Sequence, residues 1–232
     1  MKPALLLLHG ALGSAQQLQP LADLLAPHFT VQTLNFSGHG GRELIPGEFT
    51  MRHFAQEINQ FIAAKSLTEV HVFGYSMGGY AALLAATEQP QVFRSITTLG
   101  TKFDWSPEGA AAEAQMLNPE KLQAKVPQFA EQLARLHAPA PWQGVVTATA
   151  QMMQDLGNAP ALHELNLSQL TVPVQVLVGE LDKTAGVEDS RQFALYLVNG
   201  SFEVLPATPH PLDRANIRDL ADRTAQFIAA NS

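Results

Sequence analysis

Residues 69–86 read Glu-Val-His-Val-Phe-Gly-Tyr-Ser-Met-Gly-Gly-Tyr-Ala-Ala-Leu-Leu-Ala-Ala. The pattern predicts a buried strand that ends at Gly74, a tight turn with Ser76 at its apex, and a helix that begins at Met77. Glycine is needed on both sides of the serine because a Cβ there would collide with the neighbouring strand or helix. The positive end of the helix dipole lies at the same place. A serine in this position is set up to act as a nucleophile.

The composition bounds the class of protein. The chain has 232 residues, of which 46% are hydrophobic and 15% charged, so it can form one large globular domain with a full core. Its net charge of −7, without a basic cluster, would repel a phosphate backbone and argues against nucleic acid as a partner. The absence of cysteine excludes disulfides, thiolate metal sites and a cysteine nucleophile, and it fits a reducing compartment.

The apolar run from Leu5 to Leu8 is too short for the hydrophobic part of a signal peptide, and His9 and Gly10 end it. No apolar stretch approaches the roughly 20 residues that span a bilayer. We therefore expect a soluble, cytoplasmic protein that acts on a small molecule, has neither nucleic acid nor a membrane as a partner, and uses no metal or cofactor. The sequence patterns do not fix an oligomeric state.

Short apolar runs alternate with helical patterns along most of the chain. This order predicts an α/β fold with a mostly parallel six-stranded sheet and helices on both faces, because parallel strands need crossover connections. Ligands in such sheets bind at the carboxyl ends of the strands. Strands are expected at residues 3–8, 29–35, 70–74, 95–99, 172–179 and 202–205, and helices at 14–26, 50–65, 77–88, 187–197 and 212–230.

Residues 103–168 interrupt this rhythm. They show no strand pattern, are rich in alanine, glutamine and leucine, and are broken by six prolines, so we expect several short helices. Since the segment leaves from the carboxyl end of a strand, it should lie above that edge as a helical lid. The predicted organisation is a core of residues 1–102 and 169–232 with a lid of residues 103–168.

A serine nucleophile needs a base, usually a histidine that is itself held by a carboxylate. His210 is the best candidate among eight histidines, because it follows the last strand and has a proline on each side that restricts the loop. His39 lies near the edge of the sheet where the site is expected, but it precedes the serine in the sequence. For the others we expect a support for a loop (His9), a place in the core (His71), or a solvated surface (His28, His53, His137 and His163).

The carboxylate is expected at a strand end between the serine and the histidine. Asp182 lies on a loop after the fifth expected strand, whereas Glu180 is closer to that strand and could pair locally. We favour Asp182, although an aspartate at the entry to a helix is also common as a cap. Asp104, which follows the preceding strand, is the reserve acid.

Acyl transfer also needs two N–H donors for the oxyanion, and losing one typically costs about 100- to 1000-fold in rate. The first should be the amide of Met77, directly after the serine. The second should come from the loop after the first strand, residues 9–14, whose small residues let the backbone approach a substrate. We select the amide of Ala11 for this role.

Taken in chain order, these segments resemble the α/β-hydrolases of the single-domain kind that carries a cap. The resemblance covers nearly the whole chain and rests on His9-Gly10, residues 74–79, residues 179–182 and His210. The order of nucleophile, acid and histidine is that of the family. The first strand already carries the His-Gly loop, so we expect the first two strands of the full family sheet to be lacking. The resemblance implies a serine–acid–histidine triad and a serine hydrolase.

The insertion is the part that varies most among members of the family, so the resemblance indicates little about the substrate. Residues 102–168 carry four basic and seven acidic side chains, which disfavours an acidic carrier protein or a multiply anionic substrate. Leu12, Phe103 and Trp105 are the candidates for contact with the substrate. The composition favours a neutral ester with small to medium apolar parts.

The leading hypothesis is a serine hydrolase, similar to carboxylesterases, that cleaves such esters through an acyl-enzyme. A second hypothesis uses the same fold and triad for proton abstraction and elimination, as in menaquinone-pathway lyases, which Leu8-His9-Gly10 also resembles. Such an enzyme needs arginines in its pocket, and the lid has only Arg135. A third is a non-catalytic ligand receptor. The patterns do not distinguish an ester from a thioester or an amide.

Overall fold

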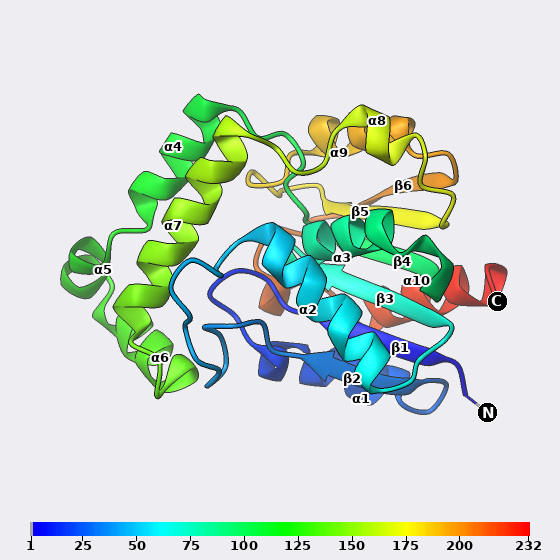
Figure 1. Cartoon of the computed structure of the whole chain (residues 1–232), viewed down its shortest axis with the longest axis horizontal. Coiled ribbons are helices and arrows are strands. Elements are labelled where there is room, and N and C mark those ends of the chain that lie inside the picture. The colour runs from blue at the N-terminus through cyan, green and yellow to red at the C-terminus, as the bar shows by residue number, and fades with distance from the viewer. Residues whose placement is uncertain (1) are drawn as a thin grey trace.

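The computed structural model describes residues 2–232, except for the side chains of Glu164 and Leu165. Within that range, six parallel strands form one sheet in the order β2-β1-β3-β4-β5-β6 (Figure 1). The α/β fold and the parallel six-stranded sheet expected from the sequence are confirmed. The strands are β1 (Ala4–Leu8), β2 (Thr30–Leu34), β3 (Val70–Tyr75), β4 (Phe93–Leu99), β5 (Val174–Gly179) and β6 (Gly200–Leu205).

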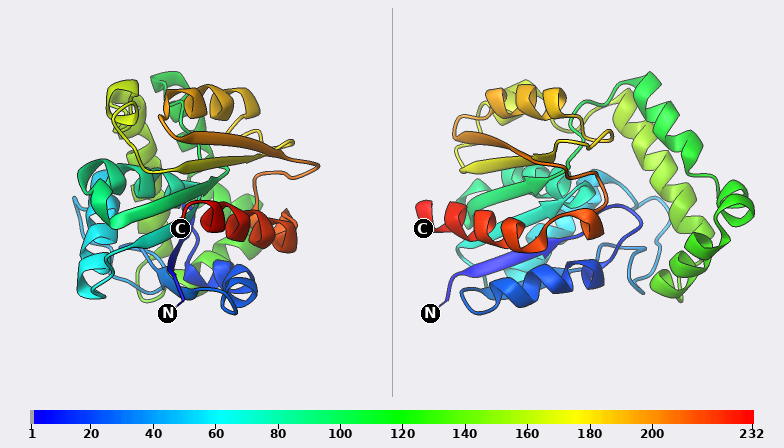
Figure 2. Two further views of the ribbon diagram at one scale, coloured as in Figure 1. Left: turned by 90° about the vertical axis from the view of Figure 1, so that its right-hand side faces the viewer. Right: turned by 180° about the vertical axis from the view of Figure 1, so that it is seen from behind.

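Helices cover both faces of the sheet. One face carries α2 (Met51–Ala64) and α3 (Met77–Glu88), which pack together, and α9 (Val187–Tyr196) shares their apolar core. The other face carries α1 (Gln19–Leu25) and α10 (Ile217–Ala230), which lie side by side (Figure 2). Among the described residues, no helix combines the length and the apolar character needed to cross a membrane.

A helical insertion, residues 103–168, joins β4 to β5. Figure 1 shows its first four helices standing beside the carboxyl ends of the strands. The described part of the insertion contains no strand, and the short helices expected there are present. The helices are α4 (Pro107–Met116), α5 (Pro119–Lys125), α6 (Pro127–His137), α7 (Trp142–Asn158) and α8 (Glu164–Leu167).

The bounds of most elements differ from the expected ones by a residue or two, but two expected helices are divided. The segment 14–26 begins as a 3₁₀ turn, Ala15–Leu18, and continues as α1. The segment 212–230 begins as a 3₁₀ turn, Leu212–Arg214, and α10 starts only after Asn216. The side chain of Asn216 caps α10 by accepting a backbone N–H of its first turn, which fixes the start of the helix there.

The register of the sheet brings the strand ends together. Leu8 at the end of β1 pairs with Gly74 of β3, and Tyr75 pairs with Leu99 at the end of β4. Leu99 in turn pairs with Leu177 of β5. The loops that follow these strands therefore meet at one edge, which is where ligands bind in parallel sheets. Strands β1, β3 and β5 are buried almost throughout, which explains their largely apolar sequences.

Candidate active site

Ser76 occupies a strained turn between β3 and α3. Its backbone has φ 52° and ψ −115°, at a positive φ that residues other than glycine rarely adopt. The Ser76 N–H donates to the Leu99 carbonyl (2.8 Å), which holds the turn against the end of β4. The turn leaves no room for a side chain at Gly74, because a Cβ there would lie 2.5 Å from the backbone of Gly79. This crowding is the physical reason for the glycines around the serine.

Three side chains from different loops form a hydrogen-bonded chain. The hydroxyl of Ser76 lies 3.3 Å from Nε2 of His210, and Nδ1 of His210 donates to Oδ2 of Asp182 (2.8 Å). Because Nδ1 carries the proton in this arrangement, Nε2 is free to accept the hydroxyl proton of Ser76. The structure thus brings together the serine, the histidine and the acid selected from the sequence, although 134 and 28 residues separate the bonded pairs.

The loop after β5 fixes Asp182 in one orientation. Oδ1 of Asp182 accepts the N–H groups of Thr184 and Ala185, both at 2.9 Å, and the residue is 5% exposed. Oδ2 therefore remains directed at the imidazole. Glu180, the alternative acid, instead accepts a backbone N–H of the histidine loop (2.8 Å), and the reserve acid Asp104 is exposed. Of the three acids considered, Asp182 is the one that contacts His210.

Tyr75 anchors the loop that carries His210. Its hydroxyl donates to the His210 carbonyl (3.0 Å), and the centroids of the two rings are 5.5 Å apart. Burial, together with the nearby charge of Asp182, raises the pKa of Tyr75 to about 12, so the phenol keeps its proton. Leu181 donates its N–H to the Thr208 carbonyl (3.0 Å), which joins the acid loop to the histidine loop. Sequence reasoning missed this support because Tyr75 reads only as part of the serine turn.

Two residues whose backbone N–H groups are unpaired among the described residues border the cavity at the serine. Ala11 and Met77 both line the cavity beside Ser76. Neither N–H donates to a backbone or side-chain acceptor in the part of the chain that the structure describes. The residue after Ala11, Leu12, has a positive φ of 58°, which turns the loop that follows β1. These are the two donors that the sequence analysis selected for an oxyanion.

A histidine cluster, formed by His9, His39 and His137, connects this loop to the helical insertion. The ring centroids of His9 and His39 are 5.0 Å apart, and those of His39 and His137 are 5.6 Å apart. All three residues are 0% exposed. His137, at the end of α6, accepts the Gly40 N–H at Nδ1 and donates from Nε2 to the Leu12 carbonyl, both at 3.2 Å. The insertion is therefore hydrogen-bonded to the loop after β1, which also carries the Ala11 N–H.

Burial keeps the histidine cluster neutral. It lowers the pKa of His9 to about 4 and also lowers the pKa values of His39 and His137. The neutral form is required by the bonding as well, because Nε2 of His9 accepts the Phe36 N–H (3.2 Å). The expectation that His137 lies on a solvated surface is wrong. Its partners are 97 and 125 residues away along the chain, and helical periodicity does not reveal them.

A narrow cavity of 40 Å³ lies beside Ser76. Lys102 and Glu113 are the charged residues among its described lining. The helical insertion contributes part of the wall, because Trp105, Glu113, Met152 and Met153 belong to it. The apolar part of the wall consists mainly of Met51, Met77, Tyr80, Trp105, Met152 and Met153.

Two of the three residues expected to contact the substrate lie outside this lining. Trp105 lines the cavity, whereas Leu12 and Phe103 do not. Phe103 is buried against Phe193 of α9, with stacked rings whose centroids are 3.5 Å apart. Leu12 offers its carbonyl to His137 of the histidine cluster. Proximity to a strand end therefore did not by itself place a side chain in the cavity.

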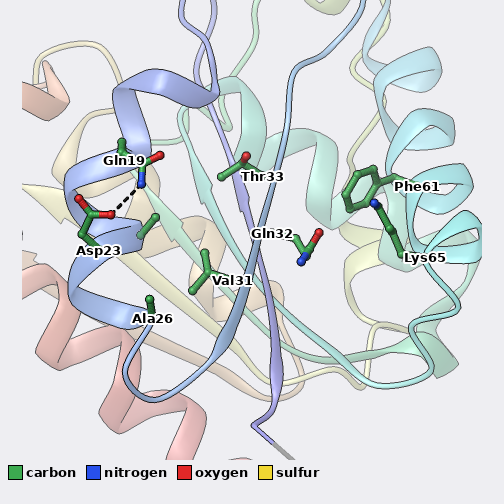
Figure 3. Close-up of a pocket in the computed structure, with 9 residues that line it drawn as sticks. Gln19, Asp23, Ala26, Val31, Gln32, Thr33, Phe61 and Lys65 are labelled. Carbon is green, nitrogen blue, oxygen red and sulfur yellow. Dashed lines mark hydrogen bonds between the residues drawn. The ribbon is translucent and has the colours of Figure 1, made fainter.

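A second cavity lies at the β2 edge of the sheet, between α1 and α2 (Figure 3). Gln19 and Asp23 of α1 are hydrogen-bonded there (2.7 Å), and Phe61 and Lys65 line it from α2. It shares no described residue with the cavity beside Ser76, and its described lining has no histidine. No group of three or more metal-ligating side chains occurs among the side chains that the structure describes. The candidate active site is therefore the cavity at the strand ends.

Comparison with known sequences gives one family and several relatives. A sequence model of the α/β hydrolase fold matches residues 3–140. The 3-oxoadipate enol-lactonase 1 of Acinetobacter baylyi is 24% identical over 207 residues, which cover 82% of this chain and 75% of that protein. The pimeloyl-[acyl-carrier protein] methyl ester esterase of Xanthomonas campestris is 38% identical over 90 residues, which cover 39% of this chain but only 34% of that protein.

Solved structures share the arrangement of the elements. A thermophilic esterase from Thermogutta terrifontis superposes with a TM-score of 0.80 and 21% identity, covering 100% of this chain and 92% of that chain. NosK from Streptomyces actuosus superposes with a TM-score of 0.82 and 20% identity, covering 100% and 99%. At these identities the likeness establishes the fold.

Proposed function

Because this chain belongs to the α/β-hydrolase fold family, we propose that it is a serine hydrolase that cleaves carboxylic esters through an acyl-enzyme. The observation that carries the proposal is the hydrogen-bonded chain from Ser76 through His210 to Asp182. It lies at the carboxyl ends of the strands and borders an apolar cavity. The match to the family model gives the class of protein, and the geometry of these side chains supports acyl transfer to Ser76.

The three side chains divide the chemistry. Ser76 attacks the ester carbonyl while Nε2 of His210 takes the hydroxyl proton. His210 then gives that proton to the leaving alcohol, and an acyl-enzyme remains on Ser76. Water attacks the acyl-enzyme with His210 again as the base, which releases the acid and restores the serine. Asp182 holds the imidazole in the required tautomer and stabilises its charged form.

The Ala11 and Met77 N–H groups form the oxyanion hole. Both border the cavity at Ser76 and lack another acceptor within residues 2–232. They stabilise the negative charge that develops on the carbonyl oxygen during attack, and each such donor is typically worth about 100- to 1000-fold in rate. Because backbone donors in a folded loop are already oriented, they need no rearrangement when the charge forms.

The cavity favours small to medium apolar substrates. The helical insertion, residues 103–168, acts as a lid that covers the strand ends of the core, residues 1–102 and 169–232. Methionine side chains are flexible and fill irregular spaces, so the wall can rearrange around different acyl or alcohol groups. The names of two relatives, an enol-lactonase and a methyl ester esterase, are consistent with ester cleavage in this branch of the family.

The test is hydrolysis of 4-nitrophenyl esters of increasing chain length by the native protein and by Ser76→Ala. We expect turnover by the native protein and a loss of at least about 10⁴-fold in Ser76→Ala, because the nucleophile is removed. Ser201→Ala, which alters an exposed serine of β6, is the matched control and should retain full turnover. Equal turnover by the two variants would contradict the proposal. Ligand binding without turnover of any ester would favour a receptor instead.

A further inference from the structure

We infer that Lys102 binds a carboxylate on the substrate, so that the preferred esters carry one negative charge at a distance from the scissile bond. This inference rests on the proposed ester hydrolysis at Ser76 and specifies its substrate class. Lys102 is the only basic residue among the described residues that line the cavity beside Ser76. Most of the remaining wall is apolar, so the ammonium group of Lys102 is the part of the wall that attracts an anion.

The backbone fixes Lys102 close to the nucleophile. The preceding residue, Thr101, donates its hydroxyl to the Ser76 carbonyl (3.0 Å). On the other side, the indole N–H of Trp105 donates to the Lys102 carbonyl (3.1 Å). The side chain is half-buried, and its stem starts from a segment that is anchored directly to the serine turn. The backbone of Lys102 is therefore held next to the serine turn, and its side chain extends from there to the Thr184 carbonyl.

The ammonium group of Lys102 keeps hydrogen-bonding capacity for a ligand. It can donate three hydrogen bonds, and its one acceptor among the described residues is the Thr184 carbonyl, at 3.4 Å. It also lies 5.5 Å from the centroid of the Trp105 ring, a cation–π contact that does not occupy a conventional hydrogen-bond acceptor and leaves its N–H donors available. Among the side chains that the structure describes, it forms no ion pair with an acidic group. A carboxylate on the substrate would supply the missing partner.

Glu113 limits the number of charges that the cavity accepts. It lines the same cavity from α4, and its carboxylate would repel a second negative group on the substrate. A monoanionic ester fits this pair better than a polyanion. The net acidic character of the insertion favoured a neutral ester, but that count includes residues on every side of the insertion. The cavity itself carries one basic and one acidic residue.

The alternative role for Lys102 is a structural one, in which it joins its own segment to Thr184 in the loop of the acid. The two roles predict different substrate dependence. A structural support would affect all esters alike, because loss of the support would disturb the acid and the histidine. A ligand for the substrate would affect only esters that carry a carboxylate.

The experiment compares esters that differ in one group. The substrates are mono-4-nitrophenyl esters of adipic, pimelic and suberic acids, whose carboxylates are too distant to form a five- or six-membered cyclic anhydride, and the corresponding ω-amides, which have nearly the same shape without the charge. For the best chain length we expect the native protein to favour the carboxylate by about 10- to 100-fold in kcat/KM, the range for hydrogen bonds to a charged group. In Lys102→Met the ratio of kcat/KM for the carboxylate ester to that for the amide ester should fall to about one.

Two further variants control for general electrostatics. Lys183→Met removes the same charge from an exposed lysine in the loop of the acid, which does not line the cavity, and should leave the preference in place. Glu113→Gln should strengthen the preference a few-fold by removing the opposing charge. Raising the ionic strength should weaken it, because salt screens the attraction.

The inference is overturned if the native protein does not distinguish the two ester types, or if Lys102→Met lowers turnover of both equally. Either result leaves ester hydrolysis intact, provided that turnover of the amide ester is lost in Ser76→Ala. Binding of the intact esters to Ser76→Ala tests Lys102 even without turnover. We expect tighter binding of the carboxylate ester there, lost in Ser76→Ala/Lys102→Met, and equal binding of the two esters would also overturn the inference.

Discussion

The strand-end loops and the helical insertion form the two sides of the candidate active site by different means. On the first side, Ser76 and Asp182 are each fixed by backbone hydrogen bonds within a short loop after a buried strand. On the second side, Met152 and Met153 project from α7, a helix held mainly by packing against α4. The candidate site thus combines side chains that are held by hydrogen bonds with a wall of flexible methionine side chains.

The histidine cluster is the place where the two sides are joined. His137 of the insertion contacts the backbone of the loops after β1 and β2, through Leu12 and Gly40. The loop after β1 also supplies the Ala11 N–H. A change in the insertion can therefore alter the catalytic rate through the histidine cluster. A change at Met152 or Met153 should alter only the choice of substrate.

On the strand-end side of the site, the largest expected effect is a loss of kcat in Asp182→Asn. An asparagine does not hold the imidazole of His210 in the required tautomer, so kcat for 4-nitrophenyl butyrate should fall by about 10⁴-fold. Glu180→Gln, two residues away, is the matched control and should reduce kcat by less than about threefold, because Glu180 supports only a backbone N–H. Similar losses in both variants would show that the loop, and not the acid, is what matters.

Acid should lower the free energy of unfolding through the histidine cluster, which joins the insertion to the strand-end loops. The folded protein holds these histidines neutral, whereas the unfolded chain protonates them below about pH 6.5. The unfolded state therefore binds more protons, and the free energy of unfolding falls as pH decreases from 6.5 to about 4. His9 alone, which is fully buried, accounts for about 3 kcal/mol of this loss.

Urea unfolding at pH 7 and pH 4.5 measures this dependence. His39→Phe should make the loss of stability on acidification smaller, because it removes one buried titrating ring from an aromatic environment that suits phenylalanine. His28→Gln, at an exposed histidine, should leave the loss unchanged. The same pH dependence in all three proteins would rule out the histidine cluster as its source.

A smaller effect, about tenfold in kcat, is expected for His137→Ala, because the Leu12 carbonyl loses its donor and the Ala11 N–H is less well placed for the oxyanion. KM should change less than kcat, since His137 does not line the cavity. His137→Gln should restore part of the rate by offering an N–H to the same carbonyl. Arg135→Ala, on the exposed side of α6, is the control. A rise in KM alone would place the effect in the substrate-binding wall.

On the strand-end side, the sequence patterns selected residues that the structure brings together, and the reason is physical. Strand periodicity, the glycines at Ser76 and the parallel topology together determine which loops meet, so Ser76 and His210 could be selected without coordinates. The choice between Asp182 and Glu180 was less constrained, because both follow the same strand. Two backbone N–H groups, which sequence spacing does not show, direct Asp182 toward the histidine.

The insertion side was predicted less well. Its short helices follow from composition and prolines, but the faces that they bury depend on contacts between distant segments. His137 reads as a helix-end surface residue and is instead buried against two loops. Phe103 and Leu12 lie near strand ends, yet one stacks on Phe193 and the other contributes its carbonyl. Proximity in sequence could identify Trp105 but could not exclude these two.

The central claim is that His210 activates the hydroxyl of Ser76, and labelling with a fluorophosphonate followed by peptide mass spectrometry tests it most directly. The account predicts one adduct per chain, located on Ser76, with no adduct in Ser76→Ala and much slower labelling in His210→Ala. A native protein that stays unmodified, or an adduct on another residue, would contradict it.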